Sequence, residues 1–201
     1  MKMTKTRWAV ILTVMLLLIS AFAADVSVFA RDCEELRGDV LRLHVIANSD
    51  SEEDQAVKLR VRDLLLDITK DRVGDAVDKA DAERFFAENA AELTEAVNAF
   101  LRESGLNYGA ALSLARSEFE TREYDGFTLP SGEYDALKVV LGAGEGKNWW
   151  CVLFPPLCVS AADGSELPAR EYKLMQSGGT VRYKIKLKIV EWFRYLKSLF
   201  E

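Results

Sequence analysis

The sequence predicts an α+β fold in which N-terminal helices cover a mainly antiparallel sheet, as a single domain that follows an apolar N-terminal segment. Three observations lead to this prediction. The 201 residues are 49% hydrophobic and 29% charged, a globular composition that suits one domain and a short extension. Residues 41–104 pass from a strand period into helical periods. From residue 107 onward the period returns mostly to that of strands.

The first thirty residues have the three parts of an export signal. Three basic residues, Lys2, Lys5 and Arg7, precede an apolar run over residues 8–19. The small residues of a cleavage site follow at Ala21-Phe22-Ala23. The pattern predicts cleavage after Ala23 and export of the remainder across a membrane.

Two alternatives to this cleavage stay open. Val28-Phe29-Ala30 offers a later site, and the segment could also remain as an anchor, because residues 8–24 are at the lower limit of a bilayer-spanning helix. In each case the basic N-terminus places the rest of the chain outside the cytoplasm. We therefore expect a signal peptide or N-terminal membrane segment at 1–30 and one exported domain at 31–201.

Charge restricts the partners of this domain. Without the three basic residues of the signal, 23 basic residues face 32 acidic ones, a net charge of −9. Nucleic acid is therefore not an expected partner. Residues 170–201 differ, with eight Lys or Arg against three Glu, and this basic C-terminal segment predicts a peripheral contact with anionic lipid head groups.

Residues 41–66 join a strand to a helix and organise the fold. Alternating apolar residues predict a strand over 41–47, which the polar run Asn48-Ser49-Asp50 stops. Ser51 is the expected N-cap of a helix over 53–72, whose acidic first turn suits the helix dipole. Gly74 is expected in the left-handed conformation that often ends a helix.

A second helical tract covers residues 81–104, as one helix or two. Its candidate N-caps are Asp78 and Asp81, and its candidate C-cap is Gly105. Its acidic residues are expected to form a solvated face, since no His or Cys lies near them in the sequence.

Strands are expected at 110–118, 135–141 and 149–154. A turn at Leu129-Pro130-Ser131-Gly132 precedes the second of them. The third is apolar on both faces, which predicts a central strand covered on both sides, and Pro155-Pro156 ends it because proline cannot donate to a sheet.

The C-terminal residues carry two successive patterns. Apolar residues alternate with basic ones over 181–187, which predicts a last strand with one basic face. Apolar residues at helical spacing follow over 189–200, which predicts a short amphipathic helix that either covers the sheet or touches a membrane.

Little in the sequence points to catalysis. His44 is the only histidine, so a hydrolase would have to use it with Cys151 or a serine as the nucleophile. No G-x-S-x-G motif supports this, and no cluster of metal-type ligands is present. The glycine-rich run 142–148 lacks the first Gly and the final Ser or Thr of a Walker A loop, so it is interpreted as a flexible connection between strands. We expect no catalytic residues, no cofactor and no metal.

The chain has three cysteines, Cys33, Cys151 and Cys158, in an exported domain where thiols can oxidise. Cys151 and Cys158 are the plausible pair, although Pro155-Pro156 between them leaves the distance of their Cα atoms open. Their disulfide is a hypothesis that thiol counting with and without reductant tests, and three free thiols without reductant would exclude it.

Two longer stretches resemble a known family. HVIANSDSEEDQAVKLRVRD at 44–63 and NWWCVLFPPLC at 148–158 are similar to stage II sporulation protein R, as are LPSGEY at 129–134 and the glycine-rich connection before the double tryptophan. The resemblance implies a protein made in the forespore and exported to the space between forespore and mother cell. There it would trigger a membrane aspartic protease, the sigma-E factor-processing peptidase, which cleaves the sigma-E precursor. The family has no known catalytic residues to carry over.

The partner-binding residues expected on this basis are His44, Asn48, Ser49 and Asp50, with Trp149 and Trp150 as anchors if they are exposed. The alternative for Asn48 to Asp50 is that they only cap the helix. Two other functions stay open: a secreted hydrolase that uses His44, and a structural envelope protein.

Overall fold

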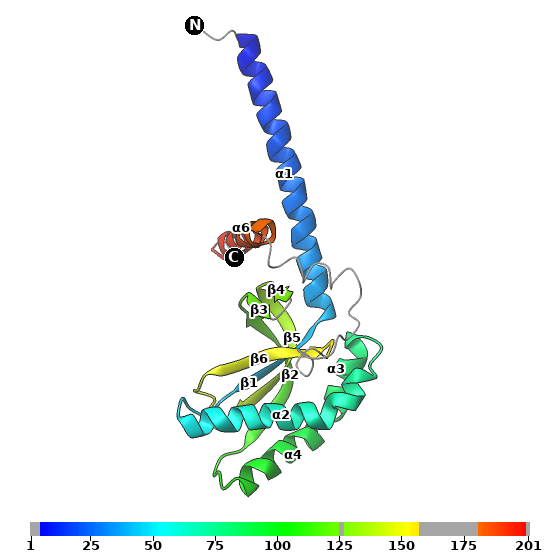
Figure 1. Ribbon diagram of the computed structural model, residues 1–201, viewed down its shortest axis with the longest axis vertical. Helices are drawn as coiled ribbons and strands as arrows, with labels where there is room; N and C mark the ends of the chain where they lie inside the picture. Colours follow the sequence, from blue (N-terminus) through cyan, green and yellow to red (C-terminus); the bar gives the residue numbers. More distant parts are fainter. Residues whose placement is uncertain (1–4, 125–126, 157–180, 200–201) are drawn as a thin grey trace.

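The computed structural model describes residues 5–124, 127–156 and 181–199. Its helices are α1 (Lys5–Asp39), α2 (Glu52–Gly74), α3 (Lys79–Glu88), α4 (Ala90–Glu103) and α6 (Val181–Ser198). Its strands are β1 (Leu41–Ile46), β2 (Ala110–Phe119), β3 (Arg122–Tyr124), β4 (Phe127–Leu129), β5 (Gly132–Leu141) and β6 (Asn148–Phe154). Figure 1 shows α1 as a long helix that projects from the domain formed by the rest.

A four-stranded sheet forms the centre of the domain, in the order β2-β5-β1-β6. β1 pairs with β5 in parallel, and the other two pairings are antiparallel, so the α+β fold with a mainly antiparallel sheet is confirmed. The parallel pair requires a crossover between the two strands. α2, α3 and α4 lie in that crossover, and β3 and β4 add a separate small hairpin.

Helices α2, α3 and α4 cover one face of the sheet, as predicted (Figure 1). This helix-covered face carries alternate residues of the two central strands, such as Leu43 and Val139. Val61, Phe86 and Val97, one from each helix, pack against it and are almost fully buried. The predicted helix at 53–72 thus corresponds to α2, whose apolar stripe is the side turned to the sheet.

The second face of the sheet, opposite the helices, is covered differently. Leu36 of the last turn of α1 and Val40, the residue after that helix, pack there with Tyr134 of β5 and Val152 of β6. Arg42 is also fully buried on this face, with its guanidinium 4.0 Å from the ring centroid of Phe119. The last residues of α1 are therefore part of the domain core.

Helix α6 packs against α1 through a third apolar cluster. Phe29 of α1 meets Tyr183 of α6 edge to face, with ring centroids 5.1 Å apart. Leu187 and Val190 of α6 complete the contact around the buried Cys33. α1 is thus one continuous helix with an exposed N-terminal part and a C-terminal part buried against two different clusters.

The predicted strand at 181–187 is wrong, because these residues begin helix α6. The alternation of apolar and basic residues fits a strand locally, but Tyr183, Leu187 and Val190 also follow steps of four and three. In the structure that helical stripe packs on α1, while Ile185 of the same alternation is exposed. The local pattern allows both a strand period and a helical period, and packing against α1, which is distant in sequence, selects the helix.

The prediction that 149–154 is central is also wrong. β6 lies at an edge of the four strands that the structure describes. Its two faces are nevertheless both covered, since Cys151 packs under the helices and Val152 packs on the second face. Burial on both faces therefore does not require a strand neighbour on both edges. The strand ends at Phe154, before the two prolines, as predicted.

Helix ends are confirmed in part. Asp78 caps α3 by accepting the backbone N–H of Asp81, and the tract 81–104 is two helices that break at Asn89. Gly105 follows α4 with a φ of +78°. Gly74 is not left-handed, because it is the last residue of α2 and the right-handed Asp75 caps the helix.

Candidate partner-binding site

The connection from β1 to α2 is a polar corner formed by Asn48, Ser49 and Asp50. The next residue, Ser51, is extended and accepts the backbone N–H of Asp54 at 3.1 Å, which confirms it as the N-cap. The helix is therefore capped by Ser51, and the three corner residues have other contacts.

Asp54 is the acceptor at the centre of the corner. The Asn48 amide donates to its Oδ2 at 2.9 Å and the Ser49 hydroxyl donates to the same oxygen at 2.5 Å. The Tyr108 hydroxyl, from the segment before β2, donates to Oδ1. Asp54 is almost fully buried, and burial raises its pKa, but the hydrogen bonds from Ser49, Tyr108 and Asn48 outweigh this and leave the pKa below its ordinary value. We infer an ionised carboxylate that ties three segments together.

The corner also holds the glycine-rich loop between β5 and β6. The Asn48 side-chain oxygen accepts the backbone N–H of Ala143 at 2.9 Å, and Asp50 accepts that of Lys147 at 2.7 Å. Gly142 has a φ of +54°, and a Cβ there would lie 2.1 Å from the Asn48 oxygen. The loop is a strand connection as predicted, but it is docked on the corner, and the glycine allows the close approach.

Lys58 of α2 forms a further contact with the same loop. It is buried on α2 and donates from Nζ to the Lys147 carbonyl at 3.0 Å and to the side chain of Gln55 at 2.6 Å. Burial lowers the pKa of Lys58, and the charge of Asp50 opposes this shift. The polar groups of Asn48 and Ser49 thus already have hydrogen-bond partners within the chain, and the role of these residues in partner binding stays a prediction.

His44 lies apart from this network, on the second face of the sheet. It pairs with Lys138 of β5 and with Trp150 of β6, and its ring centroid is 6.0 Å from that of Trp150. Both ring nitrogens are shielded from solvent, and neither forms a hydrogen bond with good geometry to a residue within 5–124, 127–156 or 181–199. Burial lowers the pKa of His44, while the nearby Asn148 side chain favours the charged form. His44 is thus a half-buried ring whose pKa lies below its ordinary value.

The two tryptophans lie on opposite faces of β6 and are half-buried. Trp149 packs against the core under the helices, with the Arg62 guanidinium 4.4 Å from its ring centroid. Trp150 packs on the second face, with Arg122 at the same distance. The structure therefore does not bring the two rings together as one anchor, and their role in partner binding stays a prediction.

Cys151 does not face His44. In the sheet register Cys151 pairs with Leu43, on the helix-covered face, whereas His44 points to the second face. The disulfide hypothesis involves Cys158, which lies outside the described residues. Cys33 is a buried free thiol, and burial raises its pKa to about 11, while Arg37 opposes this shift. In the described part of the chain, no three His, Cys, Asp or Glu residues gather in a way that could hold a metal ion.

Comparison with known proteins gives the family. The model of stage II sporulation protein R matches residues 37–163, more than half of the chain. The chain belongs to the stage II sporulation protein R family. A curated member, stage II sporulation protein R of Bacillus subtilis strain 168, is 34% identical over 134 residues, which cover 66% of this chain and 60% of the relative. The aligned part is thus less than two thirds of that relative's length. No solved structure matches the chain significantly.

In this stage II sporulation protein R family member, the matched region contains the whole sheet, the polar corner and the glycine-rich loop. Most of α1 and all of α6 lie outside it. Sequence reasoning found the corner but missed Asp54, Lys58 and Tyr108. Asp54 stands three residues after the N-cap, where it was interpreted only as a favourable charge for the helix dipole. Tyr108 had no local signal, because its partner is 54 residues away.

Proposed function

We propose that this protein is an exported sporulation signal that activates the membrane sigma-E factor-processing peptidase by contact across the space between forespore and mother cell. The activated peptidase then cleaves the sigma-E precursor in the mother cell. Membership of the stage II sporulation protein R family is the observation that carries this proposal. Helix α1 supports it, because by length and composition it could cross a membrane, which suits an exported or anchored protein.

A ligand activates a receptor only by binding its active arrangement more tightly than the inactive one. For a protease whose two aspartates come from two chains, that arrangement would be the paired form. Such a ligand needs a rigid surface and no chemistry of its own. The polar corner meets this requirement, because Asp54 and the docked loop hold it in one geometry.

The corner presents carboxylates to solvent. Asp50, Glu52, Glu53 and Glu145 are all exposed around the junction of β1, α2 and the glycine-rich loop. The junction lies at the end of β1 opposite to α1, so it faces away from the membrane segment (Figure 1). We propose that this acidic surface contacts basic groups on the extracytoplasmic part of the peptidase, with Asp50 at its centre.

Reconstitution in a non-sporulating host tests the proposal. The peptidase and the sigma precursor are expressed together, and this chain is supplied with or without its N-terminal segment. We expect processing only when the chain is exported. Equal processing without the chain, or with the chain kept inside, would refute activation from outside, and no processing in any arm would favour a structural envelope role.

Two substitutions locate the contact in the same assay. Asp50→Ala removes an exposed carboxylate together with the hydrogen bonds that it accepts from the Lys147 backbone N–H and the Gln55 side chain, and we expect a large loss of processing. Asp67→Ala is the matched control, because Asp67 is an exposed carboxylate further along α2 whose partner is Lys70. Equal activity of the two variants, at equal folded amounts, would place the contact elsewhere.

The alternative function, a hydrolase that uses His44, lacks an assembled nucleophile. Cys151 lies on the other face of the sheet, and no hydroxyl of the residues that the structure describes donates to the imidazole. We expect His44→Gln to retain processing nearly in full. A loss of essentially all activity in a folded His44→Gln protein would instead favour catalysis.

A further inference from the structure

Helix α6 has a second apolar face that no described part of the chain covers. Tyr183, Leu187 and Val190 face α1, whereas the exposed Ile185 and Trp192 lie on another side of the helix. Ile189 lies between them at steps of four and three, and it is half-buried at the edge of the contact with α1. Ile185 and Trp192 are 54% and 56% exposed, and the neighbouring Phe193 is 58% exposed. A helix that is apolar on two sides is built to pack on two partners.

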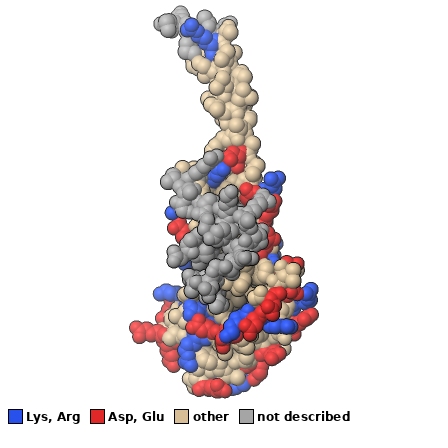
Figure 2. All heavy atoms as spheres, turned by 45° about the vertical axis from the view of Figure 1, so that its right-hand side comes forward, with Lys and Arg blue, Asp and Glu red and all other residues tan. Residues whose placement is uncertain are grey.

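The position of this face relative to α1 identifies the second partner. The uncharged run of α1 ends at Asp25, the first charged residue after Arg7. Figure 2 shows the projecting part of α1 almost without charged atoms up to its junction with the domain. Seventeen residues of helix span about 25 Å, close to the thickness of the bilayer hydrocarbon. The membrane surface therefore falls near Asp25.

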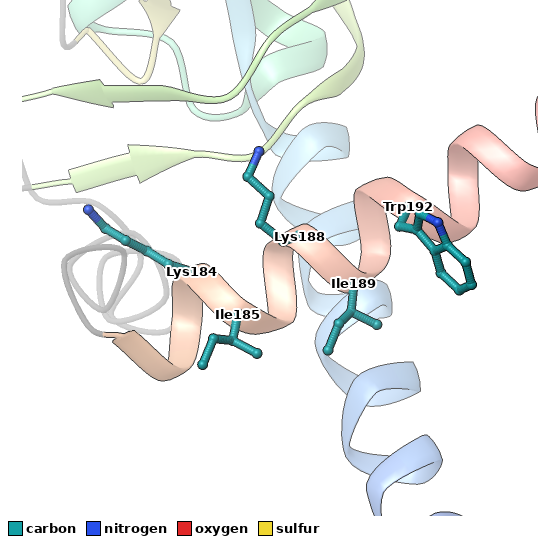
Figure 3. Close-up of a pocket in the computed structure, with 5 residues that line it drawn as sticks. All are labelled: Lys184, Ile185, Lys188, Ile189 and Trp192. Carbon is teal, nitrogen blue, oxygen red and sulfur yellow. The ribbon is translucent and has the colours of Figure 1, made fainter.

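Helix α6 is fixed at that level. Its Lys186 donates to the Asp25 carboxylate at 2.8 Å, and its Tyr183 packs on Phe29, one turn further along α1. α6 crosses α1 at a large angle, so it runs along the membrane plane when α1 crosses the membrane (Figure 1). Figure 3 shows Ile185, Ile189 and Trp192 pointing to the side on which α1 continues toward its N-terminus, and Lys184 and Lys188 pointing away from it.

We propose that α6 is an interfacial helix that inserts Ile185, Ile189, Trp192 and Phe193 into the outer leaflet of the membrane that α1 enters. The ligand is the lipid bilayer itself. An apolar stripe with tryptophan, parallel to the surface and beside a spanning helix, matches the usual form of interfacial helices. This contact persists after cleavage at Ala23, because the part of α1 that holds α6 begins at Asp25.

The basic residues of α6 contribute less to membrane affinity than their number suggests. Lys184 pairs with Glu123, Lys186 with Asp25 and Lys188 with Glu191, each at 2.8 Å. Their charges are therefore compensated within the domain, and apolar insertion is the main source of membrane affinity. We expect a contact that responds weakly to salt and to the fraction of anionic lipid.

Fluorescence quenching of the full chain in liposomes tests the proposal. Lipids with bromine on the upper acyl chain quench only tryptophans at that depth, and the difference between the native protein and Trp192→Phe isolates the emission of Trp192. We expect strong quenching of Trp192 in both neutral and anionic liposomes. The matched control is the difference for Trp149→Phe, which should show no quenching because Trp149 packs under α2.

Ile185→Glu provides a second variant that leaves the core intact, since Ile185 is exposed. It should reduce the quenching of Trp192, whereas Val77→Glu, at a residue 90% exposed in the loop after α2, should not. If a water-soluble quencher reaches Trp192 in liposomes as readily as it does without lipid, the proposal is overturned. Protection of Trp192 from both the water-soluble and the lipid quencher would also overturn it, because protein would then cover the stripe. Loss of lipid quenching at high salt would overturn it as well, because the contact would then be electrostatic.

Discussion

Removing the carboxylate of Asp54 should destabilise the protein more than any other single change at the polar corner. Asp54→Ala leaves three donors, on Asn48, Ser49 and Tyr108, without their acceptor. Hydrogen bonds to a charged group contribute about 1.5–3 kcal/mol each. Where Asn48 and Ser49 reach the surface, water can replace part of the lost hydrogen bonding. We therefore expect a loss of about 3–4 kcal/mol in the free energy of unfolding.

Denaturant unfolding of the full chain in detergent micelles, followed by far-ultraviolet circular dichroism, measures this loss. Glu53→Ala is the control, because Glu53 shares the first turn of α2 and its dipole but is exposed. Glu53→Ala should lower the free energy of unfolding by about 0.5 kcal/mol. A double-mutant cycle of Asp54→Ala with Tyr108→Phe should give a coupling of about 1–2 kcal/mol. If Asp54→Ala costs no more than Glu53→Ala, the network does not hold the corner.

The same network predicts a pH dependence. The pKa of Asp54 in the folded protein is lower than in the unfolded chain, where it is about 3.9. Its contribution to stability is therefore complete above about pH 4 and is lost as the pH falls through the folded value. The stability difference between the native protein and Asp54→Ala should narrow in acid, and a constant difference between pH 7 and pH 2 would contradict an ionised Asp54.

Three further predictions concern other parts of the chain. Gly142→Ala should lower the melting temperature, because the glycine has a positive φ and no room for a Cβ, whereas Gly74→Ala should be neutral or stabilising, since nothing lies within 4 Å of its Cβ position. Mass spectrometry of the exported protein should find no chain cut after Ala30, because that cut removes residues that pack on α6; a mature protein cut there would contradict the helix contact. Cys33 should resist iodoacetamide at pH 8 in the folded protein, since its pKa is about 11 and its side chain is buried; rapid alkylation without unfolding would refute this.

The sequence predicted those elements whose pattern is decided locally. Alternation in 41–47, the polar stop and the cap at Ser51 depend on neighbours within one turn, and all three agree with the structure. The helical tract over 81–104, which was left open as one helix or two, and the strand end before Pro155 follow for the same reason. The polar corner was predicted correctly as a junction of strand and helix, because such junctions have a composition of their own. Its part in partner binding stays a prediction.

The elements that the sequence missed depend on distant partners. Residues 181–187 satisfy two periods, and only packing on α1 selects the helix. β6 is apolar on both faces, but it lies at the edge of the four described strands. Strand order depends on which strands pair, and the apolar pattern of one strand does not show which strands are its neighbours. The glycine-rich loop was interpreted as flexible because its contacts with Asn48 and Ser49 come from residues about 95 positions earlier.

The continuity of α1 has a mechanical consequence for a signal that acts from a membrane. In the anchored form no linker separates the spanning segment from β1, because one residue, Val40, joins the helix to the strand. About 20 Å of helix beyond Asp25 and about 20 Å of strand then set the greatest height of the polar corner at roughly 40 Å. In that form the reach of the domain is constant, and the contact proposed for Asp50 would lie at a single height above the bilayer.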